Sequence, residues 1–539
     1  MAVSPAAVSD PIAVDAWAPL RRTMFRALWI ASLASNLGTW IQNVGAAWLM
    51  TMLAPDPLVV ALVQVASSLP FFLLAIPAGA LADVVDRRRL SLLALGWLTA
   101  VTALLACLSF AKLAGPATLL GLTFAIGVGG ALLGPALAAI IPDLVPRGEI
   151  PAAVSLNGIS LNLARAAGPA IGGAVVAAAG SGATFAVNAV SFLAVMLVLR
   201  RWRPEPLERK LPPEELFGAI RAGARYVRHS PPLRTVLVRT GTFVLPASAV
   251  WALLPLYARR ELGLGAAGYG ILLGFFGLGA VACGVILPSL RSRLGVERLA
   301  TGAALVFALT HVALGRFPSF APSAVSLCVA GGAWLALLTT LNAAAQIAIP
   351  SWVRARALGT YLLVQFGGLA AGSAAWGAIA GAVGVRESFG LAALAIVLGR
   401  AACWRSILTD GAGPDLAPAP RWTDVEMVRT FAPDRGPALV TVEYQIDPAD
   451  AERFARAMRE LRSIRLRDGA IRWGLWDDVA KTGRFLESFV VESWLAHLRQ
   501  HERVTAADRA VQAIARAFHR GADPPRVTHF VHEQIPADA

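Results

Sequence analysis

Long apolar stretches separated by short polar loops make up most of this chain. An α-helix rises about 1.5 Å per residue, so about 20 apolar residues cross a hydrocarbon core of roughly 30 Å. Twelve stretches reach this length, and each predicts a membrane-spanning helix: 24–51, 58–82, 90–111, 115–142, 150–180, 183–200, 235–257, 266–289, 298–316, 321–347, 355–382 and 384–407. Several are longer than needed, which predicts tilted helices or helices that extend beyond the bilayer.

The arginines in the connecting loops predict how these helices are oriented. Every second loop is basic, and together these loops carry Arg87, Arg88, Arg89, Arg147, Arg291, Arg293, Arg298, Arg354 and Arg356. The opposite loops carry chiefly Asp56, Lys112, Arg259, Arg260, Arg316 and Arg386. Because positive charge favours the cytoplasmic face, both termini are predicted to be cytoplasmic, in the inner membrane of a cell.

A long basic loop divides the apolar stretches six and six. It covers 201–234 and contains a predicted helix at 213–229, with Arg221, Arg225 and Arg228 at helical spacing. We therefore predict an all-α membrane protein of two six-helix halves, 24–200 and 235–407, after an N-terminal tail at 1–23. Two such halves with substrate bound between them suit a transporter, although other twelve-helix membrane proteins have this topology too.

Composition excludes several other classes of protein. The chain has 539 residues, of which 56% are hydrophobic and 15% charged, against about 25% charged in soluble domains. The net charge of +14 lies in short arginine clusters between apolar stretches, so we predict no nucleic-acid partner. No phosphate-binding G-x-x-x-x-G-K-[ST] motif occurs, and the four cysteines stand singly, without metal-ligand spacing.

The loop after the second apolar stretch carries a specific motif. Residues 79–89 read Gly-Ala-Leu-Ala-Asp-Val-Val-Asp-Arg-Arg-Arg. This run resembles the G-x-L-A-D-x-x-x-R-[KR] signature of the major facilitator superfamily. The resemblance implies a cytoplasmic gate latch formed by Gly79, Asp83, Arg87 and Arg88. In the second half the corresponding run, 284–293, has Pro288 in place of the acid, so only one side of the latch is predicted.

The fifth apolar stretch carries a second motif, at 165–173. Its Gly168, Pro169, Gly172 and Gly173 share one helix face with Arg165. The G-P-x-x-G-G pattern resembles the motif of exporters in the same superfamily. Small residues let a neighbouring helix approach closely, and Pro169 removes one backbone hydrogen bond. A packing seam and a bending element are both open interpretations.

Arg165 lies about fifteen residues into its predicted span. A charge at this depth costs several kcal/mol unless it faces a cavity or a partner. We predict a functional role, with pairing to helix-end carbonyls or to Asp143 as the alternative.

Polar residues inside other spans are candidates for a substrate cavity. These are Asn36, Trp40, Asn43, Gln64, Asn342, Gln346 and Gln365. The same amides could instead join helices by hydrogen bonds. No carboxylate is predicted near the centre of a span, and His311 is interpreted as a core histidine, so the coupling ion stays open.

The residues after a Pro- and Gly-rich linker at 408–437 predict a small soluble domain at 438–539. Strands are predicted at 438–446, 470–477, 484–493 and 526–535, with helices at 448–466 and 494–519. This β-α-β-β-α-β order is the ferredoxin-like arrangement, and it is similar to dimeric α/β-barrel domains. His497 and His501 lie one turn apart, but without a third ligand we predict no metal site and no cofactor.

Nearly the whole chain resembles the transmembrane secretion effector group of major facilitator exporters, which includes relatives of the enterobactin exporter. The resemblance implies efflux of a small siderophore-like or drug-like molecule, with no catalytic residues. The soluble domain is interpreted as an assembly module that could form a homodimer. The alternative is a membrane-tethered, monooxygenase-like enzyme whose helices deliver substrate to this domain.

Overall fold

The computed structural model describes residues 16–202, 216–408, 415–416 and 435–533. These residues fall into two compact units. The first holds the described residues up to Trp202, together with 239–341 and 362–405. The second holds 216–238, 342–361 and the described residues from Ser406 onward. Each unit is described by itself below.

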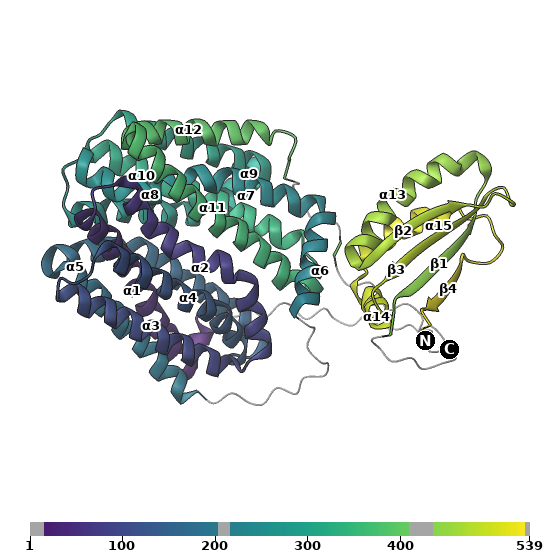
Figure 1. Ribbon diagram of the computed structural model, residues 1–539, viewed down its shortest axis with the longest axis horizontal. Coiled ribbons are helices and arrows are strands. Elements are labelled where there is room, and N and C mark those ends of the chain that lie inside the picture. Colours follow the sequence, from purple (N-terminus) through teal and green to yellow (C-terminus); the bar gives the residue numbers. More distant parts are fainter. Residues whose placement is uncertain (1–15, 203–215, 409–414, 417–434, 534–539) are drawn as a thin grey trace, which may run out of the picture. The chain divides into compact units, whose positions relative to one another are not determined.

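The membrane region consists of long helices that begin and end close to the predicted limits. In the first half they are α1 (Thr23–Leu53), α2 (Pro57–Val84), α3 (Arg87–Phe110), α4 (Pro116–Ile140) and α5 (Ile150–Arg201). In the second half they are α7 (Pro231–Ala247), α8 (Ala249–Leu256), α9 (Ala266–Arg316), α10 (Phe320–Ile347), α11 (Arg354–Val383) and α12 (Val385–Ala402). Figure 1 shows these helices as coiled ribbons, coloured from purple to green along the chain.

Two of these helices each contain two of the predicted spans. The backbone of α5 breaks at Gly180, where φ is +77°, and that of α9 breaks at Gly295, where φ is +74°. Glycine adopts this left-handed conformation without a steric penalty, which explains a sharp reversal inside one assigned helix. The break at Gly180 separates the predicted spans 150–180 and 183–200. The break at Gly295 separates the predicted spans 266–289 and 298–316.

The predicted span 235–257 is divided in the structure. It comprises α7, α8 and a π-helical turn, Tyr257–Glu261. The division between α7 and α8 falls at Ser248, which keeps helical backbone angles (φ −61°, ψ −15°) and donates its N–H to the Val244 carbonyl at 2.9 Å. Together these segments, Pro231–Glu261, form one helical stretch long and apolar enough to cross a bilayer, as the prediction of a span at 235–257 requires.

Eight helical stretches among the described residues are long and apolar enough to cross a bilayer. In this number α5 and α9 count as one stretch each, although each contains two predicted spans. Helices α1 and α12 are not among the eight, so the total of twelve spans stays a prediction.

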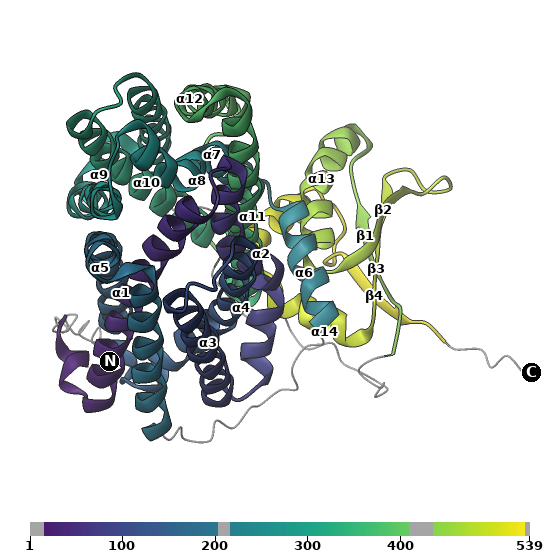
Figure 2. The ribbon, with the colours of Figure 1, turned by 60° about the vertical axis from the view of Figure 1, so that its left-hand side comes forward.

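The soluble domain contains a four-stranded antiparallel sheet. The chain order is β1 (Ala438–Gln445), α13 (Ala451–Asp468), β2 (Ala470–Asp477), β3 (Arg484–Val491), α14 (Trp494–Arg503), α15 (Ala506–Ala517) and β4 (Arg526–Val531). The strands lie side by side in the order β2-β3-β1-β4, and neighbours are antiparallel. Figure 2 shows the helices against one face of this sheet.

The core of this domain lies between the sheet and its helices. Alternate residues of β1 and β3 are buried, and Val442, Tyr444 and Phe485 pack against Phe454 and Met458 of α13. This alternation is the period of two that a half-buried strand requires. The single helix predicted at 494–519 was wrong, because Thr505 and Asp508 form a capping box that begins α15.

Candidate functional site

The small residues of α5 form a close contact with α1. A Cβ atom built on Gly168 would lie 2.5 Å from Trp40 Cβ, and one on Gly172 would lie 2.9 Å from Ile41 Cα. Cβ atoms do not approach other atoms this closely, so neither position accepts a larger residue without movement of the helices. Packing between α1 and α5 therefore depends on these two glycines.

The same strip of α5 also contacts α9, in the other half of the bundle (Figure 2). A Cβ atom on Gly173 would lie 2.8 Å from Gly270 Cα, and one on Gly277 would lie 2.5 Å from Ala166 Cα. Glycines on both helices let the two backbones meet, as in small-residue helix pairs within membranes. The predicted exporter motif thus lies at a seam between the two halves.

Arg165 lies beside an aromatic cluster. Its guanidinium carbon is 5.9 Å from the centroid of the Trp40 ring, within the range of a cation–π contact. The centroid of the Trp40 ring lies 6.1 Å from that of Trp251 of α8. The Trp251 ring centroid in turn lies 5.8 Å from that of Trp334 of α10. Asp143, the alternative partner, forms its ion pair with Arg87 at 3.4 Å instead.

Several of the predicted cavity amides bond to polar side chains on the same or a neighbouring helix. Asn36 donates to Ser160 Oγ at 3.1 Å, and Gln64 donates to Ser68 Oγ at 2.9 Å. Gln346 donates to Asn342 on the same helix. Asn43 is exposed and Gln365 is half-buried. Of the seven candidates, the structure brings Trp40 to Arg165.

The arginines of the 79–89 motif bind helix ends within the first half. Arg87 donates to the Ala139 carbonyl at 3.0 Å, near the end of α4, and Arg88 donates to the carbonyls of Leu199 and Arg200, at the end of α5. Cations satisfy the unpaired carbonyls at a helix C-terminus and interact favourably with its dipole. Gly79 and Asp83 lie in the last turns of α2, and the Asp83 side chain is outside the described residues.

A buried charge cluster in the second half was missed from the sequence. Glu297 of α9 forms ion pairs with Arg239 of α7 and with Arg400 of α12, the latter at 2.6 Å. Thr301 accepts hydrogen bonds from both arginines, at 3.3 and 2.9 Å. The signal was present, because Arg239 and Arg400 both fall inside predicted spans, where a charge needs a partner.

The two halves also meet at the ends of α1 and α8. Arg259 donates to the Thr51 carbonyl, and Arg260 donates to the Pro55 carbonyl. One turn before Thr51, the Trp48 ring stacks on Tyr269 of α9 at 6.1 Å. This end carries the loops that the arginine distribution predicts to be extracytoplasmic.

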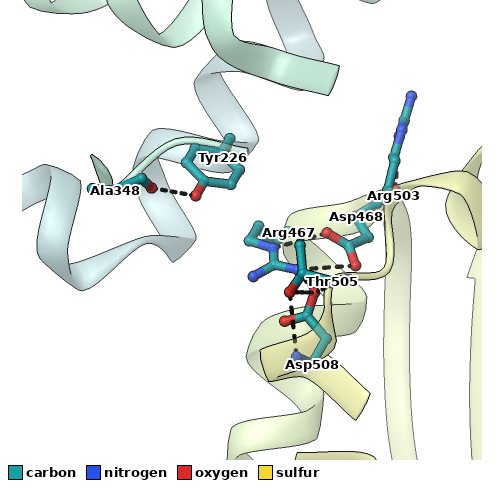
Figure 3. A network of polar contacts seen from close by, with 7 residues as sticks. All are labelled: Tyr226, Ala348, Arg467, Asp468, Arg503, Thr505 and Asp508. Atoms are coloured by element: carbon teal, nitrogen blue, oxygen red, sulfur yellow. Dashed lines mark hydrogen bonds and ion pairs between the residues drawn. The ribbon is translucent and has the colours of Figure 1, made fainter. Parts of the chain in front are cut away.

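In the second unit, the linker helix α6 (Leu216–His229) contacts the connection between α10 and α11. The Tyr226 hydroxyl donates to the Ala348 carbonyl at 2.6 Å (Figure 3). Arg467, at the end of α13, lies 5.8 Å from the Tyr226 ring, and Arg503 lies 4.6 Å from the Trp352 ring. The soluble domain, the linker helix and the α10–α11 connection therefore form one body.

A polar network fixes Arg467 in this position (Figure 3). It binds Asp468 at 2.8 Å and Asp508 at 2.7 Å, while Thr505 donates to Asp508 at 2.7 Å. Burial lowers the pKa of Arg467, but the neighbouring Asp468 and Asp508 outweigh it and hold this pKa above its usual value. Arg467 thus remains a cation beside Tyr226.

An ion-pair cluster joins α6 to the sheet. Arg221 and Arg225 of α6 bind Glu492 at 3.6 and 3.4 Å, just after β3. These residues include two of the three linker arginines that were singled out for their helical spacing. Two of the linker arginines thus form ion pairs with the residue that follows β3.

Curated transport proteins are similar to parts of this chain. The staphyloferrin A transporter of Staphylococcus aureus is 25% identical over 269 residues, which cover 49% of this chain and 66% of that protein. The multidrug efflux pump Tap of Mycolicibacterium fortuitum is 28% identical over 278 residues, which cover 45% of this chain and 65% of the pump. The chain thus spans just under two thirds of the length of these relatives.

Solved transporter structures share the fold. An inward-facing bacterial homologue of the lysosomal transporter Spinster matches with a TM-score of 0.58 at 15% identity, over 74% of this chain and 99% of its own. An inward-facing bacterial homologue of the iron transporter ferroportin matches with a TM-score of 0.56 at 17% identity, over 71% and 98%.

A family model supplies the assignment. The model described as transmembrane secretion effector matches residues 14–537, nearly the whole chain. This match confirms the family that the motifs around Asp83 and Arg165 predicted. The chain belongs to the transmembrane secretion effector family of major facilitator transporters, and it is a multi-pass membrane protein.

Proposed function

We propose that this protein is a secondary active exporter that moves a small organic molecule out of the cytoplasm by alternating access. The observation that carries the proposal is the seam between α5 and α9, with Arg165 beside Trp40 at its edge. Relatives named for a siderophore and for drugs support a substrate of one of these classes. None of the comparisons supports the alternative of a membrane-tethered enzyme.

The bending element of this cycle is Pro169. A proline leaves the carbonyl four residues earlier, that of Arg165, without its helical donor. A Cβ atom on Gly277 would lie 2.7 Å from this carbonyl oxygen, so α9 closely approaches the weakened point of α5. Bending of α5 there would separate or join the halves beside Arg165.

The contacts between the halves support a state closed on the outer side. Gly173 meets the beginning of α9, and Arg259 and Arg260 bind carbonyls at and just beyond the end of α1, all at the end predicted to be extracytoplasmic. In this state the motif arginines bind carbonyls of their own half. We propose that Asp83, Arg87 and Arg88 bind the second half when the cytoplasmic side closes, with Gly79 allowing the approach.

The substrate cavity is proposed to lie between the halves. Its candidate lining residues are Asn36, Trp40, Asn43, Gln64, Asn342, Gln346 and Gln365. Bonds such as that from Asn36 to Ser160 would be exchanged for bonds to substrate. Aromatic rings beside a cation suit a substrate that is partly apolar and carries an acidic group.

We propose that the protein crosses the inner membrane twelve times, with both termini in the cytoplasm. The breaks at Gly180 and Gly295 support this number, since they divide α5 and α9 into two segments each. Helices α1 and α12 would be the remaining spans.

We further propose that the soluble domain is ferredoxin-like and pairs with that of a second copy. The strand order β2-β3-β1-β4 supports the fold. On the sheet face away from the helices, the Trp476 and Phe530 side chains are exposed, close in register to Leu486 and Leu439. An apolar sheet face suits a two-fold interface. Trp476→Asp is expected to give monomers in light scattering, and a dimer unchanged by this substitution would contradict the pairing.

The transport proposal is tested in cells that lack the gene. Retention of siderophores and drugs from a panel should rise in these cells and return to normal on complementation. A proton uncoupler added during the assay tells whether export uses the proton gradient. Asp83→Asn should abolish export at normal membrane abundance, and normal export by this variant would contradict the latch.

A further inference from the structure

Three histidines of the soluble domain meet at one point. His497 and His501 lie one turn apart on α14, and His529 lies on β4. One ring nitrogen of each lies within 4.8 Å of the others. The Nε2 atoms of His497 and His501 are 3.0 Å apart. The third ligand that the sequence lacked beside His497 and His501 is thus supplied by a strand 28 residues further along the chain.

This spacing is close to that of a metal centre. Zinc binds histidine nitrogens at about 2.0–2.1 Å, and tetrahedral angles then separate two such nitrogens by about 3.3 Å. Small side-chain rotations would bring all three rings to this separation. We propose that His497, His501 and His529 bind one divalent transition-metal ion, of which Zn²⁺ is the reference case, with a further coordination position left open.

A cavity lies beside the three histidines, and the open coordination position of the proposed metal ion would face it. It has a volume of about 200 Å³ and is lined by apolar residues, the three histidines, Gln500, Gln512 and two arginines. His497 is 2% exposed, and its Nδ1 atom has no hydrogen-bond partner among the described residues. The side-chain nitrogens of Gln500 and Gln512 are buried and unpartnered in the same way. Buried polar atoms normally find partners, so a ligand in this cavity accounts for several unmet bonds at once.

The environment of the three histidines keeps their imidazoles neutral. Burial, and then the charges of His501 and His529, lower the pKa of His497 to about 3, and burial lowers the pKa of His501 and His529. Neutral imidazole is the form that binds metals. Arg465 also lines the cavity, but it forms an ion pair at 3.1 Å with the buried Glu487. The positive charge of Arg465 still contributes to the lowered pKa of His497 and His501, and Arg516 also lines the cavity.

The chemistry of the donors narrows the choice of ion. Three imidazoles suit Zn²⁺, Cu²⁺, Ni²⁺ and Fe²⁺, whereas Mg²⁺ and Ca²⁺ prefer oxygen ligands. Three protein ligands leave a position for water or for a small molecule in the cavity. The apolar walls and Arg516 would favour a ligand with an acidic group and an apolar body.

The test measures binding of Co²⁺ and Zn²⁺ to the full-length protein in detergent. A tag without histidines is used, and chelators are removed first. The wild-type protein should bind one Co²⁺ per chain with visible ligand-field absorption, and Zn²⁺ should abolish this absorption. Zn²⁺ should also raise the melting temperature, because a ligand specific for the folded state stabilises it.

Two variants and one control decide the outcome. His529→Ala and the more conservative His501→Asn should weaken Co²⁺ binding at least about tenfold, as even the loss of an outer partner does at metal sites. His532→Ala removes an exposed histidine of the same domain and should change nothing. Wild-type protein without Co²⁺ absorption would overturn the proposal, as would full binding by His529→Ala. Gel filtration establishes that each variant is folded before it is scored.

Discussion

The Arg165 guanidinium lies 5.9 Å from the centroid of the Trp40 ring, so the charge deepest in the predicted fifth span faces an aromatic ring. A planar guanidinium stacks on an aromatic ring better than an ammonium does. We expect Arg165→Lys to lower the initial rate of efflux about tenfold, which corresponds to about 1.4 kcal/mol of lost stabilisation. Arg165→Ala should lower it further.

Efflux from loaded cells measures this effect, normalised to membrane abundance. Arg293→Ala serves as the control, because Arg293 is an exposed arginine outside the seam. Full activity of Arg165→Ala would show that Arg165 has no part in transport.

Gly172 and Gly158 lie on the same helix but differ in their surroundings. A Cβ atom on Gly172 would lie 2.9 Å from the α1 backbone, whereas one on Gly158 would meet nothing within 4 Å. Overpacking costs about 1–3 kcal/mol, so Gly172→Val should lower the melting temperature and abolish efflux. Gly158→Val makes the same chemical change without the clash. Equal losses in both variants would contradict the dependence of α1–α5 packing on Gly172.

Glu297 lies between two arginines, one of which, Arg239, has a side chain only 4% exposed. Loss of the carboxylate leaves buried positive charges uncompensated, at a cost of about 3–5 kcal/mol. Glu297→Gln should therefore unfold well below the wild-type temperature, and adding Arg239→Met should recover part of the loss.

Glu149→Gln provides the comparison for Glu297. Glu149 pairs with Arg22, whose side chain is 52% exposed, and such a pair is worth about 0–1 kcal/mol. Thermal unfolding in detergent measures both variants. If Glu297→Gln and Glu149→Gln lower the unfolding temperature equally, the buried cluster stabilises the protein no more than an exposed ion pair does.

Tyr226 holds the linker helix α6 to the α10–α11 connection. Tyr226→Phe removes its hydrogen bond to Ala348, worth about 0.5–1.5 kcal/mol, and Glu492→Gln weakens the ion pairs to Arg221 and Arg225. Both variants should increase amide hydrogen exchange in 216–229. Glu533→Gln affects only the exposed pair with Arg435 and should leave this exchange unchanged. If exchange in α6 is the same in all three, the helix is held by other contacts.

The local pattern of apolar and polar residues was sufficient to predict most of the helices and strands. Apolar length alone placed the limits of α3 and α10 within three residues, because each helix satisfies its backbone hydrogen bonds internally. The strands predicted at 438–446 and 484–493 correspond to β1 and β3, in which alternate residues are buried, as a strand with one buried face requires. The local pattern failed at Thr505, where the capping box with Asp508 begins a new helix inside a continuous pattern.

The sequence by itself determined the family, the elements and the helix face that joins Arg165 to Gly173. Only the tertiary structure decided which residues meet across elements: Arg239 with Glu297, Tyr226 with Ala348, and His529 with His497. Helical periodicity reports neighbours three or four residues apart, whereas these pairs are separated by at least 32 residues. Their contact depends on how whole helices and strands pack, which no local spacing encodes.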